Sequence, residues 1–162
     1  MNPLRVLFVC AENSVQSPMA EALLNATDST HFETTSVGLE AGQIHPFTVD
    51  VMKDIGIDLA GKRTKTTRDV AHRSFDFVIT LCSRAKKECP EFKGAEIIHW
   101  QFEDPAGTDA ARQKRIFASL RDQISQRIRL FALVQVRFTA VNTLARHATS
   151  KVEGHRNVQM PA

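Results

Sequence analysis

The first 28 residues constrain the fold most, because they predict a strand, a loop and a helix in direct succession. Residues 4–10, with the sequence LRVLFVC, form a nearly continuous apolar run that is typical of a parallel strand covered on both faces. A polar loop follows, and Ser17-Pro18 predicts a helix start at which the hydroxyl caps the helix and proline takes the first helical position. Helical spacing then relates the apolar residues Met19, Ala22, Leu23 and Ala26.

The rest of the chain predicts strands that alternate with helices. Strands are expected at residues 31–38, 75–81 and 95–99. Helices are expected at 46–55, stopped by the left-handed cap residue Gly56, at 83–89, and from 108 or 109 to about Val134. This alternation predicts an α/β domain over residues 1–136, with three layers and a four-stranded parallel sheet flanked by helices.

Charge sets residues 137–162 apart from this domain. Of the 21 Lys and Arg and the 18 Asp and Glu residues, 17 of each sign lie in residues 1–136. Residues 137–162 contain the remaining four basic residues and one acidic residue, Glu153, so they form a weakly basic C-terminal extension. A short amphipathic helix is expected around residues 138–145, and disorder from about Thr149. Scattered charges more often keep a tail solvated than bind nucleic acid, so no nucleic-acid partner is expected.

The composition favours a cytosolic protein. No apolar stretch reaches the roughly 20 residues that a membrane span needs, and the first residues lack a signal-peptide layout. We therefore expect a monomer without membrane contact. Three cysteines are too few for a secreted disulfide scaffold, and in a reducing compartment they are buried filler, catalytic groups or redox partners. The six histidines are dispersed, so no zinc site is expected.

The loop after the first strand is the candidate site, because ligands bind outside the carboxyl ends of parallel strands. Backbone N–H groups and the dipole at the start of the next helix favour an anion there. The same field stabilises a thiolate, so Cys10 is a candidate nucleophile, although a cysteine ending a strand is more often a small buried hydrophobe. The expected oxyanion-binding residues are Ala11, Glu12, Asn13, Ser14, Val15, Gln16 and Ser17.

This loop resembles the phosphate-binding loop of the low-molecular-weight protein tyrosine phosphatase family. In that family a cysteine is followed by five residues, an arginine and a serine or threonine. Cys10, Asn13, Ser14 and Ser17 fit the pattern, whereas Gln16 replaces the arginine. The resemblance covers about residues 4–135.

Three later segments resemble the arsenate reductase branch of the family, which is coupled to thioredoxin. They contain Cys82, Cys89-Pro90 and Asp104-Pro105. The resemblance implies a relay in which Cys10 attacks the arsenic of bound arsenate and Asp104 protonates the departing oxygen. Cys82 then attacks the Cys10 adduct to release arsenite, and Cys89 closes a disulfide with Cys82. Thioredoxin or another external thiol would reduce that disulfide, and no bound cofactor is implied.

The spacing of Cys82 and Cys89 adds a requirement. Seven residues are about two helical turns, which would hold the two sulfurs roughly 10 Å apart, beyond the reach of a disulfide. The segment between them must therefore unwind when it is oxidised.

The resemblance also implies that Asn13, Glu21 and Ser36 brace the loop. In some arsenate reductases such groups help bind a potassium ion together with a more distant acid. Lys65 stands nearest to the position of that acid, so we expect its ammonium to replace the metal and no metal to be bound.

Gln16 is the main departure from the family pattern, because it offers an amide N–H without a charge. Loss of a donor aimed at transition-state charge predicts turnover roughly 100-fold to 1000-fold lower. Another cation, namely Arg63, Lys65 or Arg84, is a candidate to supply the missing charge from a different position.

Three hypotheses remain open. A thiol-coupled arsenate reductase is favoured by Cys82 and Cys89. A low-molecular-weight protein tyrosine phosphatase is less favoured, because Ala106-Gly107 follows Asp104-Pro105 where aromatic residues are common in such phosphatases, and the chain has no tyrosine. A catalytically impaired protein that binds an oxyanion or senses oxidation is the third, and Gln16 is its chief support.

Overall fold

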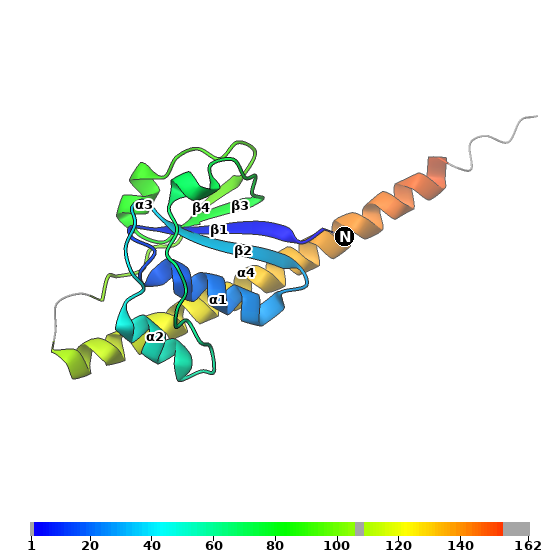
Figure 1. Cartoon of the computed structure of the whole chain (residues 1–162). Helices are drawn as coiled ribbons and strands as arrows, with labels where there is room; N and C mark the ends of the chain where they lie inside the picture. Colours follow the sequence, from blue (N-terminus) through cyan, green and yellow to red (C-terminus); the bar gives the residue numbers. More distant parts are fainter. Residues whose placement is uncertain (1, 106–108, 154–162) are drawn as a thin grey trace, which may run out of the picture.

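The computed structural model describes residues 2–105 and 109–153, and their side chains as far as Thr149 (Figure 1). Four strands, four α-helices and one 3-10 helix follow one another along this part of the chain. In order, they are β1 (Leu4–Cys10), α1 (Gln16–Asp28), β2 (Phe32–Gly38), α2 (Pro46–Lys53), η1 (Thr67–Val70), β3 (Phe77–Thr80), α3 (Ser83–Glu88), β4 (Glu96–His99) and α4 (Ala110–Glu153).

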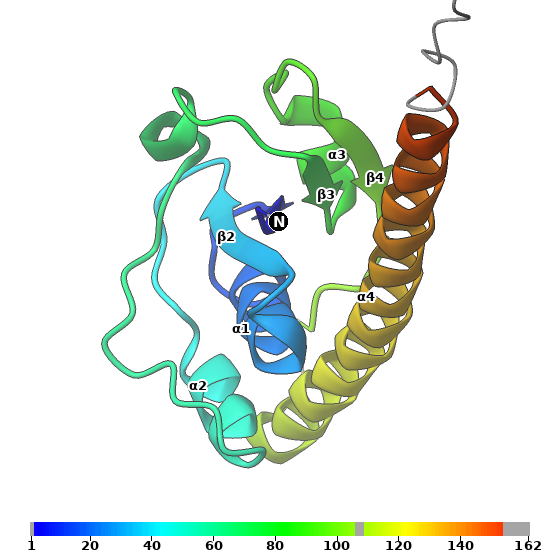
Figure 2. The same cartoon turned by 90° about the vertical axis from the view of Figure 1, so that its right-hand side faces the viewer.

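The four strands form one parallel sheet in the order β2-β1-β3-β4. Alternate side chains of β1 serve two separate cores, as strand geometry requires. Phe8 packs with residues of α1 and α4, whereas Leu7 packs with Ala85 of α3 and with Val70 of η1. Figure 2 shows α1 and α4 on one side of the sheet and α3 on the other. The predicted three-layer α/β fold is confirmed.

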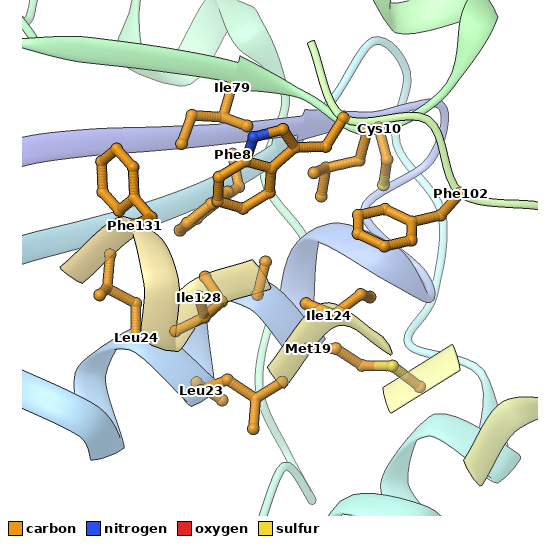
Figure 3. Close-up of a cluster of buried hydrophobic side chains, with 14 of the residues drawn as sticks. Phe8, Cys10, Met19, Leu23, Leu24, Ile79, Phe102, Ile124, Ile128 and Phe131 are labelled. Carbon is orange, nitrogen blue, oxygen red and sulfur yellow. The ribbon is translucent and has the colours of Figure 1, made fainter. Parts of the chain in front are cut away.

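The larger core lies between the sheet, α1 and α4 (Figure 3). Phe8 and Ile79 reach into it from the sheet, and Met19 reaches into it from α1. Trp100 is also buried there, with its ring 5.7 Å from that of Phe131 on α4. This core fixes the end of β1 against the start of α1, where the candidate site lies.

The start of α1 differs from the prediction. The helix begins at Gln16 with Val15 as its N-cap, and no side chain caps it. Ser17 is wholly buried, and its hydroxyl contacts the sulfur of Cys10 and the amide of Asn13 instead of capping the helix. The predicted capping by Ser17 and the predicted first position for Pro18 were therefore wrong, because Cys10 and Asn13 of the preceding loop are the partners of the hydroxyl.

The end of α4 also differs from the prediction. A single helix of 44 residues runs to Glu153, so the expected end near Val134 and the expected separate helix around 138–145 are wrong. At 1.5 Å per residue, α4 is about 66 Å long and projects beyond the sheet (Figure 1). No glycine or proline interrupts residues 134–149, and Thr139 and Thr143 bond to carbonyls four residues earlier. Most of the tail expected to be disordered lies outside the described residues.

Candidate active site

The carboxyl ends of the parallel strands bring the site residues to one edge of the sheet. Cys10 is the last residue of β1 and is paired with Gly38, the last residue of β2. On the other side of β1, the N–H of Leu81 donates to the carbonyl of Val9 at 2.9 Å, which continues the pairing beyond β3. Cys82 follows directly, so the start of α3 lies close to the loop that leaves Cys10.

The loop between β1 and α1 carries a run of backbone donors without partners. In the part of the chain that the structure describes, no backbone N–H of residues 11–15 donates to another group of the protein. The first N–H groups of α1 also lack intrahelical acceptors, because they open the helix. The positive end of the α1 dipole adds to these donors, so the loop offers an anion both hydrogen bonds and a favourable field.

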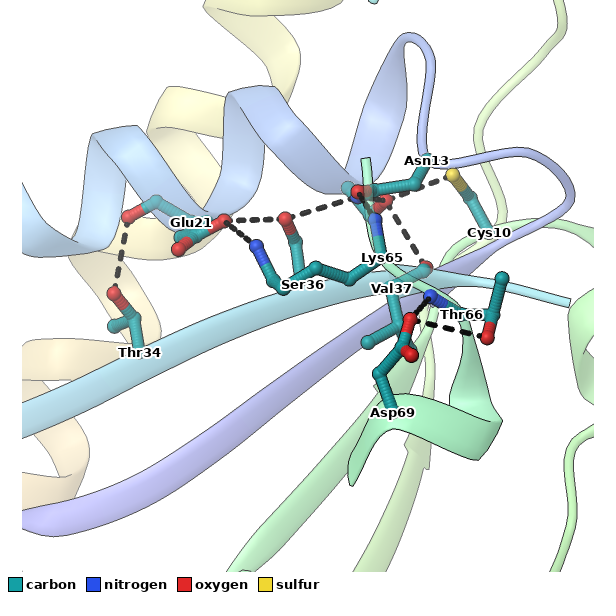
Figure 4. Close-up of polar contacts among 10 residues, drawn as sticks. Cys10, Asn13, Glu21, Thr34, Ser36, Val37, Lys65, Thr66 and Asp69 are labelled. Carbon is teal, nitrogen blue, oxygen red and sulfur yellow. Dashed lines mark hydrogen bonds and ion pairs between the residues drawn. The ribbon is translucent and has the colours of Figure 1, made fainter. Parts of the chain in front are cut away.

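Asn13 shapes this loop. Its backbone has a φ of 56°, a left-handed conformation that asparagine adopts more readily than most residues. Its side-chain nitrogen donates to the hydroxyls of Ser17 and Ser36 at 2.9 and 3.0 Å, and its oxygen accepts from the backbone N–H of Lys65 at 2.9 Å (Figure 4). Asn13, Ser17 and Ser36 are all buried, so water does not compete for these hydrogen bonds.

Glu21 extends the same network from α1. The hydroxyl of Ser36 donates to its carboxylate, and the ammonium of Lys65 lies 3.9 Å from the same carboxylate oxygen (Figure 4). The structure thus brings together the three residues expected to brace the loop, with Lys65 beside them. The ammonium offsets a negative charge that would otherwise oppose an anion in the loop. That no metal binds here stays a prediction.

Cys10 is buried, and its sulfur lies 2.8 Å from the hydroxyl oxygen of Ser17. The hydroxyl can donate to a thiolate or accept from a thiol. Ser17 also lies 3.3 Å from the carbonyl of Val37, so it has a second acceptor when Cys10 carries its proton. The pair therefore accommodates both protonation states of the sulfur without rebuilding the loop.

Gln16 stands at the first position of α1 with only 8% of its surface exposed. Across residues 2–105 and 109–153, its side-chain amide has no hydrogen-bond partner. None of its polar atoms is sealed away from solvent without a partner, so the amide remains available to a ligand. An amide donates hydrogen bonds without charge, which is weaker than the fork of an arginine.

The three cations considered as substitutes for the loop arginine are differently engaged. Arg84 pairs with Glu40 at 2.9 Å and with Glu88 at 3.3 Å, and the guanidinium holds the pKa of the exposed Glu40 carboxyl below its ordinary value. Lys65 pairs with Glu21, and Arg63 is exposed. Among the described residues, no hydrogen bond or ion pair joins any of the three to the side chains of Cys10 or Gln16.

Other residues hold the loop from outside, and they were not predicted from the sequence. The carbonyl of Ser14 accepts from the backbone N–H of His45 and from the hydroxyl of Thr48, both at 3.1 Å. Gly38 lets the loop approach β2, since a Cβ there would lie 2.6 Å from the backbone nitrogen of Asn13. His45-Pro46 at a helix start and the glycine ending a strand were the available signals, but neither names its partner in the loop.

Cys82 and Cys89 are free thiols at the two ends of α3. Cys82 is the N-cap, and its sulfur accepts from the backbone N–H of Ala85 at 3.4 Å. Cys89 is half-buried, and burial raises the pKa of its thiol to about 11. The thiol donates to the carbonyl of Pro90 at 3.5 Å. Cys89 therefore holds its proton at neutral pH in this conformation.

Asp104 is exposed near the end of the first described segment. Its carboxylate forms no hydrogen bond or ion pair with any residue in that segment or in residues 109–153. Phe102, two residues earlier, donates its N–H to Leu81 and packs in the same core as Cys10 (Figure 3). The structure thus places the Asp104 segment at the carboxyl edge of the sheet, where Cys10 also lies, and the acid role of Asp104 stays a prediction.

A cysteine that ends a buried parallel strand, followed by unpaired N–H groups and a helix start, defines a class of α/β protein that presents a thiol to an oxyanion. Residues 5–147 match the model of the low molecular weight phosphotyrosine protein phosphatase family. The chain belongs to this family.

Relatives within the family include several arsenate reductases. The arsenate reductase of Halalkalibacterium halodurans is 34% identical over 135 residues, which cover 82% of this chain and 97% of that protein. The glutaredoxin arsenate reductase of Synechocystis sp. is 33% identical over 125 residues, which cover 76% of this chain and 92% of that protein.

Solved structures of family members are also similar to this chain. A structure described as an arsenate reductase in the phosphate binding state superposes with a TM-score of 0.68 and is 29% identical, covering 79% of this chain and 95% of that one. The low molecular weight protein tyrosine phosphatase of T. tengcongensis has a TM-score of 0.64 at 27% identity, covering 77% and 95% of the two chains.

Proposed function

We propose that this protein reduces arsenate to arsenite at Cys10, with thioredoxin or a similar thiol as the electron source. The observation that carries the proposal is the presence of two further free thiols on α3, with Cys82 at the carboxyl edge of the sheet beside the Cys10 loop and Cys89 at the other end of the helix. The names of the relatives from Halalkalibacterium halodurans and Synechocystis sp. support arsenate as the substrate.

Binding uses the unpaired donors of the loop. Arsenate is a tetrahedral oxyanion, and the free N–H groups of residues 11–15, the start of α1 and the amide of Gln16 are donors suited to its oxygens. The Asn13 network holds these donors in place before the ligand arrives, so little ordering remains to be done on binding.

Chemistry begins when the Cys10 thiolate attacks arsenic. A sulfur–arsenic bond forms, an arsenic–oxygen bond breaks, and Asp104 gives its proton to the departing oxygen, which leaves as water. The Cys82 thiolate next attacks the sulfur of Cys10. A disulfide forms between Cys10 and Cys82, and the electron pair of the broken sulfur–arsenic bond reduces arsenic from the pentavalent to the trivalent state.

Regeneration of the Cys10 thiolate requires movement of α3. Cys89 must lose its proton and attack the sulfur of Cys82, which frees the Cys10 thiolate and leaves a disulfide between Cys82 and Cys89. The two cysteines cap opposite ends of α3, and Cys89 is half-buried with a raised pKa. Unwinding of α3 after the first disulfide forms would expose Cys89 to water and bring its sulfur to Cys82.

The reductant follows from this chemistry. A disulfide left on the surface after α3 unwinds is a substrate for an external dithiol, and the cytosol supplies one. One relative is named as a glutaredoxin arsenate reductase, and one similar solved structure is described as a thioredoxin-dependent arsenate reductase of Corynebacterium glutamicum. We favour thioredoxin because two cysteines besides Cys10 allow the disulfide to form within the chain.

The test combines arsenate, thioredoxin, thioredoxin reductase and NADPH with the reduced protein. NADPH oxidation should depend on arsenate and disappear in Cys10→Ser. The Cys89→Ala variant should release one arsenite per chain and stop with Cys10 joined to Cys82, as peptide mass mapping would show. Replacing thioredoxin by glutathione and glutaredoxin distinguishes the reductants. Absence of arsenite under both conditions, with arsenate bound, would reject the reductase.

Gln16 favours a second candidate, an impaired family member that binds an oxyanion without turnover. The Gln16→Arg variant decides between the two, because arginine restores the charged fork that the loop lacks. If the wild-type loop is only weakened, Gln16→Arg should raise arsenate turnover about 100-fold or more. Assays with an aryl phosphate ester in parallel test the phosphatase alternative. A loss of arsenate turnover in Gln16→Arg would mean that the loop is adapted to its glutamine.

A further inference from the structure

In the projecting half of α4, the large apolar side chains lie on the face that points away from the core, toward solvent. Up to Ala132 the buried residues of α4 face α1 and the sheet. Between Leu130 and Leu144, six large apolar residues are 52% to 71% exposed, and we call them the outer strip: Leu130, Leu133, Val134, Phe138, Val141 and Leu144. At 3.6 residues per turn, they cover about 140° of the helix surface.

The opposite face of the same segment is polar. Five polar residues of this segment line a hollow of about 480 Å³ against the edge of the sheet where its strands begin, and Phe138, at one margin of the apolar face, borders the same hollow; the five are Gln135, Thr139, Asn142, Thr143 and Arg146. The apolar and polar faces are therefore reversed relative to a helix that packs its apolar side on its own domain. A second body must cover the outer strip if it is not to remain in water, because contiguous exposed apolar patches of this kind mark interaction surfaces.

The charge of this segment indicates what kind of partner covers the outer strip. Between Asp122 and Glu153 the chain has no acidic residue, whereas it has four arginines: Arg127, Arg129, Arg137 and Arg146. Helical spacing places Arg137 inside the outer strip, midway between Leu130 and Leu144. A second copy of the strip, laid parallel or antiparallel about its middle, would oppose Arg137 to its own counterpart in a largely apolar contact. Like charges without partners disfavour that pairing.

We propose that the outer strip lies on the surface of a membrane that contains anionic lipids. The apolar side chains would enter the boundary between headgroups and acyl chains, while the long side chain of Arg137 extends to a lipid phosphate. Cationic residues near such a surface are attracted by its negative potential. This departs from the expectation, based on the sequence, of no membrane contact.

The geometry favours a helix lying on the membrane over a helix crossing it. By length and composition, Ala110–Thr149 is long and apolar enough to cross a membrane. Its first half, however, is committed to the core through Phe117, Ile124 and Ile128, and the second half has a polar face. The outer strip lies toward the edge of the sheet where the strands begin, and Cys10 lies at the other edge, so membrane contact leaves the candidate active site open.

Vesicle flotation with the full-length reduced protein tests the proposal. Vesicles of phosphatidylcholine mixed with phosphatidylglycerol should carry the protein upward, and added salt should release it, because the attraction is screened. Vesicles of phosphatidylcholine alone should bind it much less. Arg137→Gln should lower the partition coefficient for the anionic vesicles about fivefold, the contribution of one arginine near the surface.

Two neighbouring substitutions provide a matched comparison. Val141→Asp removes an apolar side chain from the outer strip and adds a charge, so partitioning should fall at least about thirtyfold. Asn142→Asp adds the same charge on the polar face and should lower it no more than about fivefold. Both residues are exposed, and circular dichroism should show unchanged helix content. Equal effects of the two variants, equal binding to neutral vesicles, or a dimer that Val141→Asp dissociates without any vesicle binding would overturn the proposal.

Discussion

At the scale of single residues, Cys89 makes the clearest prediction about pH. Burial raises the pKa of its thiol to about 11, above the ordinary value of 9.0, so the folded protein disfavours the thiolate. In native protein, alkylation of Cys89 by iodoacetamide should keep accelerating up to about pH 11. In urea-unfolded protein the rate should level off near pH 9, the ordinary value for a thiol.

The sign for stability follows from the same shift. Because the folded-state pKa is the higher one, the unfolded state loses this proton first. The contribution of Cys89 to stability is therefore fully present below about pH 9 and decreases as the pH rises towards 11. Peptide mass mapping separates Cys89 from Cys10 and Cys82 in the alkylation experiment. A native profile that levels off where the unfolded one does would show that Cys89 is not protected in the folded protein.

The separation of residues along the chain determined which parts of the site could be predicted from the sequence. Cys10, Asn13 and Ser17 were identifiable because they lie close together in the sequence, in a pattern that one loop imposes. The hydrogen bonds from His45 and Thr48 to the carbonyl of Ser14 could not be identified, because each one joins segments that only the folded chain brings together. Ser17 was assigned to a helix cap because Ser-Pro is a common helix start, whereas the loop turns its hydroxyl toward Cys10 and Asn13.

At the scale of elements, boundaries were predictable where the apolar pattern changed abruptly. The bounds of β1 were predicted correctly because a charged and polar loop follows its apolar run. Gly56 ends the turn after α2 with a φ of 82°, as expected for a left-handed cap. The length of α4 was missed because its core-facing pattern stops near Ala132 while a different face becomes apolar, and a change of face resembles the end of a helix.

One ion pair links α3, through Glu40, to the loop that follows β1, and the proposed relay needs α3 to move away from that loop. Arg84 on α3 pairs with Glu40, and the backbone N–H of Glu40 bonds to the carbonyl of Ala11 in the loop. We predict that Glu40→Gln speeds formation of the disulfide between Cys82 and Cys89 by a mild oxidant, by no more than about fivefold because the pair is exposed. Rapid acid quench followed by peptide mapping measures the rate.

The control for this prediction is Glu33→Gln, which removes an exposed carboxylate paired with Arg5 and Arg73 away from α3. It should leave the oxidation rate unchanged. High salt should bring the wild-type rate close to that of Glu40→Gln, since salt screens the exposed pair. If Glu33→Gln accelerates oxidation equally, or salt leaves the difference intact, the tether between α3 and the loop does not limit unwinding.

At the scale of the whole molecule, α4 has two roles in one continuous helix. Its first half closes the core against α1 and the sheet, while its second half extends past the sheet and exposes the outer strip (Figure 1). Stability should therefore depend on α4 in its first half and hardly at all in its second. Ile124 is fully buried and Leu133 is 52% exposed, so the same kind of truncation can be compared at both places.

Ile124→Ala should lower the free energy of unfolding by about 2 to 5 kcal/mol, because it removes buried methylenes and leaves a cavity between α1 and the sheet. Leu133→Ala should change it by no more than about 0.5 kcal/mol, as expected for an exposed position. Urea denaturation followed by circular dichroism measures both from midpoints at a common slope. A loss for Leu133→Ala as large as that for Ile124→Ala would mean that the outer strip is already covered in solution by another protein chain. The division of α4 into a core half and a free half would then be wrong.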